Sequence, residues 1–123
     1  MKNVLLTAAM VMALSTGTAF AQTASNDLDS RVASVTRDMS VKLGLNESEY
    51  IKLKNINREK LVKADEITNM YKNDVSMRNA KLSELQNNYD SQLRTFLNTK
   101  QLDAYASYKV SNKNFTALED EKK

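Results

Sequence analysis

Apolar residues recur along this chain at spacings of three and four, the pattern of a helix that buries one face. The first such stretch covers residues 27–43 and carries Leu28, Val32, Val35, Met39 and Leu43. Gly44 comes directly after it and suits the left-handed backbone position that commonly ends a helix. The pattern therefore predicts a first helix over residues 27–43.

Two longer stripes occupy the middle of the chain. The first consists of Tyr50, Leu53, Ile56, Leu61, Ala64, Ile67 and Tyr71. The second repeats at intervals of seven, which is typical of a helix that packs along another helix, and it consists of Val75, Leu82, Tyr89 and Phe96, with Leu85 and Leu93 beside them. A last helix is predicted after Asn98, with Leu102, Tyr105 and Tyr108 on its apolar side.

Residues 71–75, YKNDV, decide whether the two stripes form one helix or two. Asn73 tolerates the left-handed conformation and Asp74 is a good N-cap, so the stretch favours a turn between two helices. The alternative is one uninterrupted helix from Glu47 to about Leu97, roughly 75 Å long at 1.5 Å per residue. We favour the hairpin, because an unpaired helix of that length would leave its apolar stripe in water.

The composition agrees with an all-α fold. The chain has no proline and only 2 glycines, so it lacks the turn residues that a β-rich domain needs. An acidic residue precedes a basic one by four positions, a spacing that supports helix surfaces, at Asp38/Lys42, Glu59/Lys63, Asp74/Arg78 and Asp90/Arg94. We therefore expect an elongated antiparallel helical hairpin with short flanking helices.

The first 21 residues have the organisation of a secretory signal peptide. Lys2 precedes an apolar run from Val4 to Leu14 that is too short to span a membrane. Small residues at Ala19 and Ala21 mark a cleavage site between Ala21 and Gln22. We expect a helical domain over residues 22–110, a polar and disordered tail over residues 111–123, and no stable membrane insertion after cleavage.

The residue types also limit the chemistry. The chain contains no histidine and no cysteine, the residues that supply most transition-metal ligands and many catalytic nucleophiles and bases. We therefore expect no enzymatic activity, no cofactor and no metal site. Carboxylates at Asp27 and Asp29, or at residues 119–121, could bind calcium weakly, but a solvated surface is the simpler interpretation. The 18 basic and 15 acidic residues are interspersed, so no basic patch indicates nucleic-acid binding.

One helix-start pattern occurs twice. It reads Leu45-Asn46-x-x-Glu49-Tyr50 in the first copy and Leu97-Asn98-x-x-Gln101-Leu102 in the second. In each copy, asparagine and the glutamate or glutamine three residues later can form a capping box, and the flanking apolar residues can form a hydrophobic staple. If the chain turns near Asn73, both starts lie at the same end of the hairpin, where Leu45 and Leu97 could pack together.

These two motifs resemble those of the Spy/CpxP-type periplasmic proteins, a small, secreted, mostly helical family with two Leu-Thr-x-x-Gln motifs. Here asparagine replaces the threonine in both copies, and Glu49 replaces the first glutamine. Both replacements keep the capping chemistry. The resemblance implies a periplasmic protein of the envelope stress response that binds unfolded or partly folded envelope proteins as an ATP-independent chaperone. It also implies an alternative, a regulatory or structural protein that docks on one envelope partner, such as a stress-sensor accessory.

A chaperone needs exposed apolar groups, and four residues off the main stripes are candidates for client contacts: Ile51, Val62, Met70 and Met77. Methionine is a flexible and polarizable contact that suits varied partners. The alternative for all four residues is packing against the first helix or within a homodimer. We also expect a homodimer, because large apolar residues are distributed along thin helices that a hairpin alone cannot cover.

The signal peptide predicts that exported protein begins at Gln22. N-terminal sequencing or intact-mass measurement of the exported material checks the cleavage position. Exported protein that retains Met1 would contradict both the cleavage and the assignment to the periplasm.

Overall fold

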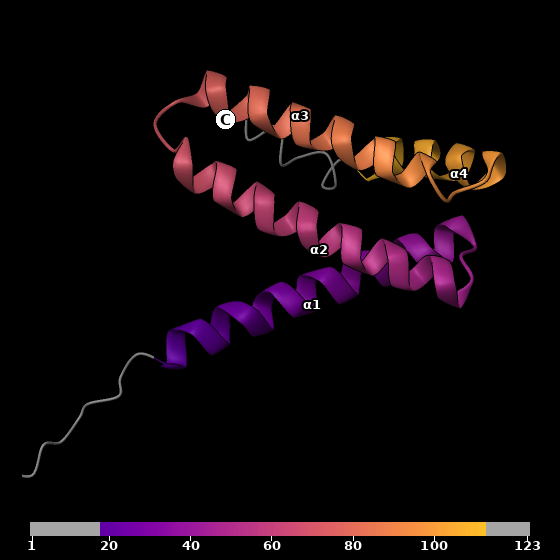
Figure 1. Cartoon of the computed structure of the whole chain (residues 1–123), viewed down its shortest axis with the longest axis horizontal. Helices are drawn as coiled ribbons and strands as arrows, with labels where there is room; N and C mark the ends of the chain where they lie inside the picture. The colour runs from indigo at the N-terminus through magenta and orange to yellow at the C-terminus, as the bar shows by residue number, and fades with distance from the viewer. Residues whose placement is uncertain (1–17, 113–123) are drawn as a thin grey trace, which may run out of the picture.

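The computed structural model describes residues 18–112, with side chains described from residue 26. This part of the chain is all-α, as predicted. It consists of four helices, α1 (Thr18–Leu43), α2 (Glu47–Met70), α3 (Val75–Arg94) and α4 (Thr99–Ser111) (Figure 1). Among these described residues, no helix has the length and apolar character needed to cross a membrane.

The first helix is longer than predicted. α1 has 26 residues, against 24 in α2 and 20 in α3, so the expectation of short flanking helices was wrong for α1. It starts at Thr18, nine positions before the predicted start at Asp27. Residues 18–26 contain neither proline nor glycine, so no helix-breaking residue interrupts this segment, although it lacks the apolar spacing on which the prediction relied.

The signal peptide and the polar tail are predictions that rest on the sequence. Residues 1–17 of the expected signal peptide and residues 113–123 of the expected tail lie outside the described residues. The expected cleavage site between Ala21 and Gln22 falls in the first turns of α1. Ser111 still belongs to α4 and Asn112 is its C-cap, so the last helix extends one residue beyond the predicted domain boundary.

α2 and α3 are separate helices that run in opposite directions side by side (Figure 1). Tyr71 is the C-cap of α2, and its N–H donates to the carbonyl of Ile67 at 3.0 Å. The chain then turns, and the side chain of Asp74 accepts from the Met77 N–H at 3.0 Å, which caps α3. The chain is therefore not one long helix from Glu47 to Leu97.

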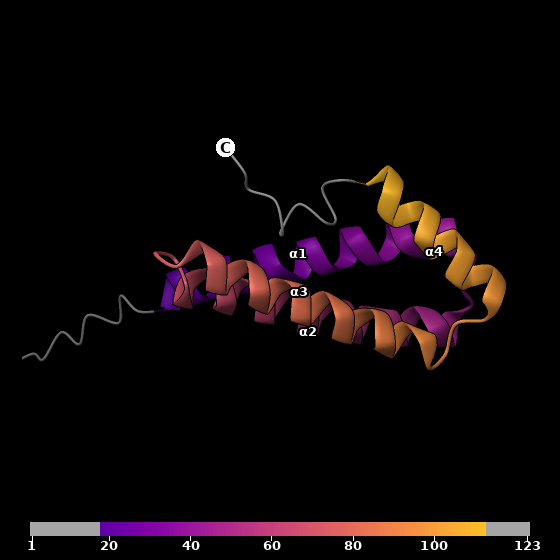
Figure 2. The ribbon, with the colours of Figure 1, turned by 90° about the horizontal axis from the view of Figure 1, so that it is seen from above.

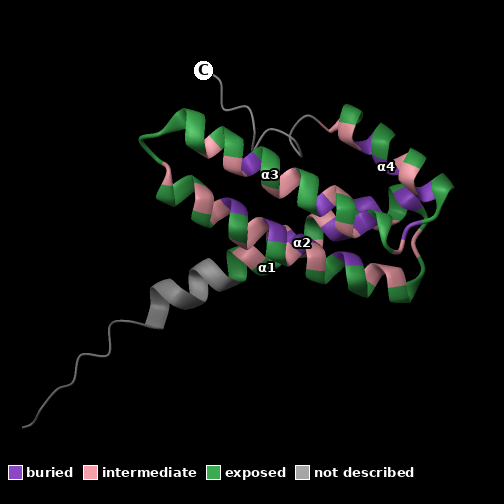
Figure 3. Cartoon of the chain, turned by 45° about the horizontal axis from the view of Figure 1, so that its top comes forward, coloured by how far each residue is buried: buried purple, intermediate pink, exposed green. Residues whose placement is uncertain are grey.

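The four helices form two layers. α2 and α3 make one layer, while α1 lies along α2 and α4 crosses from the end of α3 to α1 (Figure 2). Two ion pairs join α1 to α2: Arg31 to Asp65 at 2.9 Å and Arg58 to Asp29 at 2.5 Å. Buried residues lie where the layers meet (Figure 3), and the main apolar core consists of Met39, Leu43, Leu53, Tyr89, Leu93, Leu97, Tyr105 and Tyr108.

The face that α2 buries differs from the predicted stripe. Its buried residues are Leu53, Asn57, Lys60 and Ala64, whereas most residues of the predicted stripe are only half-buried: Tyr50, Ile56, Leu61, Ile67 and Tyr71. The prediction was right for Leu53 and Ala64 and wrong for the other stripe residues, because it counted only apolar residues and two of the four inward positions are polar. Their burial requires partners, because an unpaired polar group in the interior is costly.

Asn57 obtains those partners inside the core. Its side-chain amide donates to the Thr36 hydroxyl at 3.0 Å, and its carbonyl oxygen accepts from the Tyr89 hydroxyl at 2.5 Å. Asn57 is 2% exposed, and burial raises the pKa of Tyr89 well above its usual value, which keeps the phenol protonated as a donor. This chain of hydrogen bonds joins α1, α2 and α3 through one side chain.

Tyr89→Phe removes the donor and leaves the buried Asn57 carbonyl oxygen without its partner. We expect the free energy of unfolding to fall by about 1–3 kcal/mol, the usual cost of an unsatisfied buried polar group. Chemical denaturation with circular dichroism measures the change. Tyr71→Phe makes the same chemical change at a half-buried site in the turn and should stay within about 0.5 kcal/mol; equal effects of the two substitutions would contradict the role of the Asn57 network.

Candidate functional site

The first repeated motif builds the start of α2. Asn46 is the N-cap, and its side-chain oxygen accepts from the Glu49 N–H at 2.9 Å. Glu49 Oε2 in turn accepts from the Asn46 N–H at 3.1 Å. The two bonds form a complete capping box, which satisfies backbone donors that the first turn of a helix leaves unpaired.

The second motif builds the start of α4 in the same way. Asn98 is the N-cap, and its side-chain oxygen accepts from the Gln101 N–H at 2.8 Å. Gln101 Oε1 accepts from the Asn98 N–H at 3.0 Å. Leu97, before the cap, is buried in the core, while Leu102, on the first turn, is half-buried against it.

The two capping boxes are joined to each other. The Gln101 side-chain amide donates to Glu49 Oε2 at 2.9 Å, so one carboxylate oxygen serves both helix starts. Leu45, which is half-buried, packs against the same core that contains Leu97, and Tyr50 is half-buried as well. The structure thus brings the two motifs together at one end of the hairpin; we call this end the capped corner.

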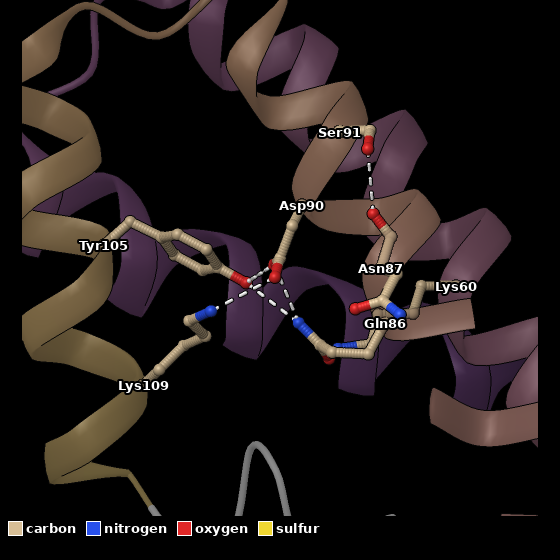
Figure 4. A network of polar contacts seen from close by, with 7 residues as sticks. All are labelled: Lys60, Gln86, Asn87, Asp90, Ser91, Tyr105 and Lys109. Carbon is tan, nitrogen blue, oxygen red and sulfur yellow. Dashed lines mark hydrogen bonds and ion pairs between the residues drawn. The ribbon is translucent and has the colours of Figure 1, made fainter. Parts of the chain in front are cut away.

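Asp90 on α3 bonds to side chains of α4, which starts at the capped corner. Its Oδ1 accepts from the Tyr105 hydroxyl at 2.6 Å and from the Gln86 amide at 2.9 Å, and its Oδ2 lies 3.1 Å from Lys109 Nζ (Figure 4). Burial, chiefly, and the bond to Asp90 raise the pKa of Tyr105 far above its usual value. The phenol therefore stays protonated and donates.

Sequence spacing did not reveal this role of Asp90. Of the four predicted acid-base pairs, only Glu59 and Lys63 form an ion pair among the described residues, at 2.7 Å. The other three acids have different partners. Asp90 pairs with Lys109 on α4, Asp74 caps α3, and Asp38 accepts from Tyr108, whose pKa burial and this bond raise to about 12. For Asp90 and Asp38 a contact with α4 replaced the local pair, and for Asp74 the cap of its own helix did.

Lys60 is a buried base that spans α2 and α3. Only 7% of the residue is exposed. Its Nζ donates to Gln86 Oε1 at 2.6 Å and lies 4.4 Å from the centre of the Tyr89 ring. The carbonyl oxygen is the negative end of a dipole, and the ring face is the negative region of the ring's quadrupole, so both compensate the ammonium group for the water that it loses on burial. Lys60 therefore belongs to the packing of the hairpin.

Two of the four candidate client contacts lie together at the α2–α3 turn. Met70 is 71% exposed and Met77 is 42% exposed, and Val75 between them in sequence is 55% exposed. We call these three residues the hairpin tip. Sequence reasoning assigned Val75 to the packed stripe, and its place at the first position of α3 explains why it is exposed.

The other two candidates lie elsewhere. Ile51 is 53% exposed and belongs to the first turns of α2, about 28 Å from Met70 along the helix at 1.5 Å per residue. Val62 is half-buried. It lies one turn from both Arg58 and Asp65, which pair with α1, so its position favours packing beside α1. The four candidates do not form one surface.

A groove follows the seam between α2 and α3. Its cavity volume is 460 Å³, and its lining includes Ile56, Lys63, Ile67, Lys81, Glu84 and Leu85. Tyr89 lines the groove and also contacts Tyr105 of α4. The charged residues of α2 and α3 that pair with α1 and α4, such as Asp65 and Asp90, do not line it. The groove therefore lies on the face of the hairpin turned away from α1 and α4, and we call it the outer groove.

Ile56, Ile67 and Leu85 were predicted as core residues and are half-buried in the outer groove. Their apolar spacing was read correctly as a helix face, but sequence alone did not indicate that α1 and α4 would cover the opposite face. No His, Cys, Asp or Glu cluster suited to a metal ion occurs among residues whose side chains are described. Asp27 and Asp29 each lie within 4.0 Å of an arginine.

Comparison with known proteins adds no assignment. No protein-family model, no curated protein and no solved structure matches the chain.

The capped corner predicts a graded loss of stability when its parts are removed. Asn98→Ala should lower the free energy of unfolding by about 0.5–2 kcal/mol, because the α4 cap is lost. Leu97→Ala should cost more, about 2–5 kcal/mol, because Leu97 is 6% exposed in the core. Asn98→Thr keeps a capping oxygen and should be nearly neutral. Denaturant titrations of the three variants measure the order.

Proposed function

We propose that this protein is a periplasmic, ATP-independent chaperone-like protein that binds unfolded or partly folded envelope proteins through the hairpin tip. The observation that supports the proposal most directly is the exposure of Met70, Val75 and Met77 together at the turn between α2 and α3. The repeated motifs of the capped corner support it through their resemblance to the Spy/CpxP-type proteins. The proposed activity is binding, without catalysis and without a cofactor.

The chemistry of the hairpin tip suits varied clients. Methionine side chains are flexible and polarizable, so they adapt to apolar groups of different shapes. Lys72 and Asp74 lie in the turn beside them and are exposed, which keeps the apolar surface small and interrupted by charges of both signs. A small patch of this kind favours weak and reversible contacts over tight binding, because little apolar area is buried per client.

In this proposal the hairpin tip binds clients, and the capped corner at the other end stabilises the fold. Most of the core cluster lies near the capped corner, whereas the tip residues are exposed and contribute little to packing. Client contacts at the tip can therefore form without the corner opening. The Asn98 side chain bonds within its own first turn, so it is not available to a client.

Met70→Ser with Met77→Ser should weaken client binding by about tenfold, corresponding to roughly 1.4 kcal/mol of lost apolar contact. Stability should stay within about 1 kcal/mol, the usual scale for exposed positions. The measurement is suppression of aggregation of several unrelated unfolded proteins, with the unfolding free energy measured in parallel. Val41→Ser, at an exposed valine on α1 (76% exposed), is the matched control and should leave suppression unchanged.

Two outcomes would contradict the proposal. If the protein suppresses aggregation of none of several clients but captures one envelope protein tightly, it is a dedicated partner-binding protein. If Asn98→Ala keeps full stability yet abolishes client binding, the capped corner is the contact surface and the methionines at the tip are not.

A further inference from the structure

We propose that a second copy of this chain packs on the outer groove, groove against groove, with a two-fold axis parallel to α2 and α3. In this arrangement α2 of each copy lies against α3 of the other, and both hairpin tips project at the same end. The proposal assigns the face through which the chain pairs with itself, and it does not depend on client binding.

The apolar content of the outer groove is the first argument. Ile56, Ile67 and Leu85 line it and remain half-buried. At the capped end the seam continues to Phe96, whose ring centre lies 5.9 Å from Lys52 Nζ. α1 and α4 lie on the opposite side of the hairpin, so none of the helices within residues 18–112 covers these side chains. An elongated apolar seam between two helices is a typical surface for further helices to pack on.

The register of α2 and α3 gives the second argument. Asn57 bonds to Tyr89 and Lys60 bonds to Gln86, so three steps forward on α2 correspond to three steps back on α3. Three positions further toward the tip, Lys63 on α2 is therefore level with Ser83 on α3, and Glu84 lies one residue, about 1.5 Å, from that height. Lys63 and Glu84 both line the outer groove, a base on one rim and an acid on the other at nearly the same height.

Charges of opposite sign at nearly the same height make the groove self-complementary. A two-fold axis along the seam brings α2 of one copy in front of α3 of the other without changing the height. Lys63 of each copy then faces Glu84 of the other, which gives two symmetry-related ion pairs flanking the apolar seam. All neighbouring helices in the resulting four-helix bundle are antiparallel, which also aligns their dipoles favourably.

The other symmetric arrangement matches the charges less well. An axis perpendicular to the helices would place α2 against α2 and α3 against α3 of the second copy. If it is centred so that Glu59 faces Lys63, the same register sets Glu84 opposite Gln86, which is already bonded to Lys60. Lys81 then faces Tyr89. The second copy then offers no opposite charge to Lys81 and Glu84, which pair with each other at 3.5 Å, so the axis along the seam is favoured.

The test is charge reversal followed by reversal of the partner. Sedimentation velocity and light scattering of the purified protein at about 1–200 µM give the dimer dissociation constant. Lys63→Glu alone and Glu84→Lys alone should each raise it at least about tenfold, because each places like charges together. The double variant should restore it to within about threefold of the wild-type value. Lys54→Glu, the same change at an exposed lysine that does not line the groove, should have no effect.

Folding and geometry have their own controls. Lys63 also pairs with Glu59 within the chain, so circular dichroism at low concentration must show that each variant remains helical. The chain has no cysteine, so Asn73→Cys places a single thiol in the turn at the tip. A short thiol cross-linker should then join two copies tip to tip, and Lys63→Glu should abolish the product.

Three results would overturn the proposal. One is a protein that is monomeric throughout this range, another is a dissociation constant that single charge reversals leave unchanged, and the third is a dimer whose tips cannot be cross-linked. All three measurements are made without a client. A monomeric protein that still suppresses aggregation would therefore refute this interface and leave the proposed chaperone activity standing.

Discussion

The hydrogen bond between Gln101 and Glu49 is the interaction on which the arrangement of the helices depends. Each side chain first completes the capping box of its own helix, and the 2.9 Å contact then joins the two boxes. The starts of α2 and α4 are fixed against each other, so α1, which precedes α2, and α3, which precedes α4, enter this corner from set directions. A glutamate at position 49 strengthens the link, because bonds to an ionised acceptor are stronger than those between neutral groups.

Local signals in the sequence predicted much of this architecture. Both helix starts and the cap at Asp74 follow from side-chain oxygens placed beside unpaired backbone donors, a short-range effect that sequence records directly. The turn at residues 71–74 follows from the same cause. The link between Gln101 and Glu49 could not be predicted in this way, because it joins residues 52 positions apart and depends on how the hairpin packs.

The interior of α2 shows where sequence reasoning fails. Asn57 and Lys60 occupy inward positions, and a search for apolar periodicity excludes both by residue type. They are buried because Thr36, Tyr89 and Gln86 offer matching hydrogen-bond partners from other helices. Conversely, apolar spacing cannot distinguish a covered face from an uncovered one, so the outer groove was interpreted as core. Met70 and Met77 lie off the main stripe and are exposed, as that position predicts.

Stability is graded along the hairpin, and the gradient connects its two ends. Near the capped corner, α2 and α3 bury Leu53 and Leu93 completely. Toward the tip the buried residues are Leu82 and Ala64, and the alanine side chain is small. A region with fewer buried apolar contacts opens locally at lower free energy than the rest of the fold. The tip can therefore rearrange its side chains and the turn at lower cost while the corner keeps the helices in place. If two copies pair along the outer groove with their tips at the same end, two such adaptable surfaces lie side by side, and a flexible client that contacts one is held at high effective concentration near the other.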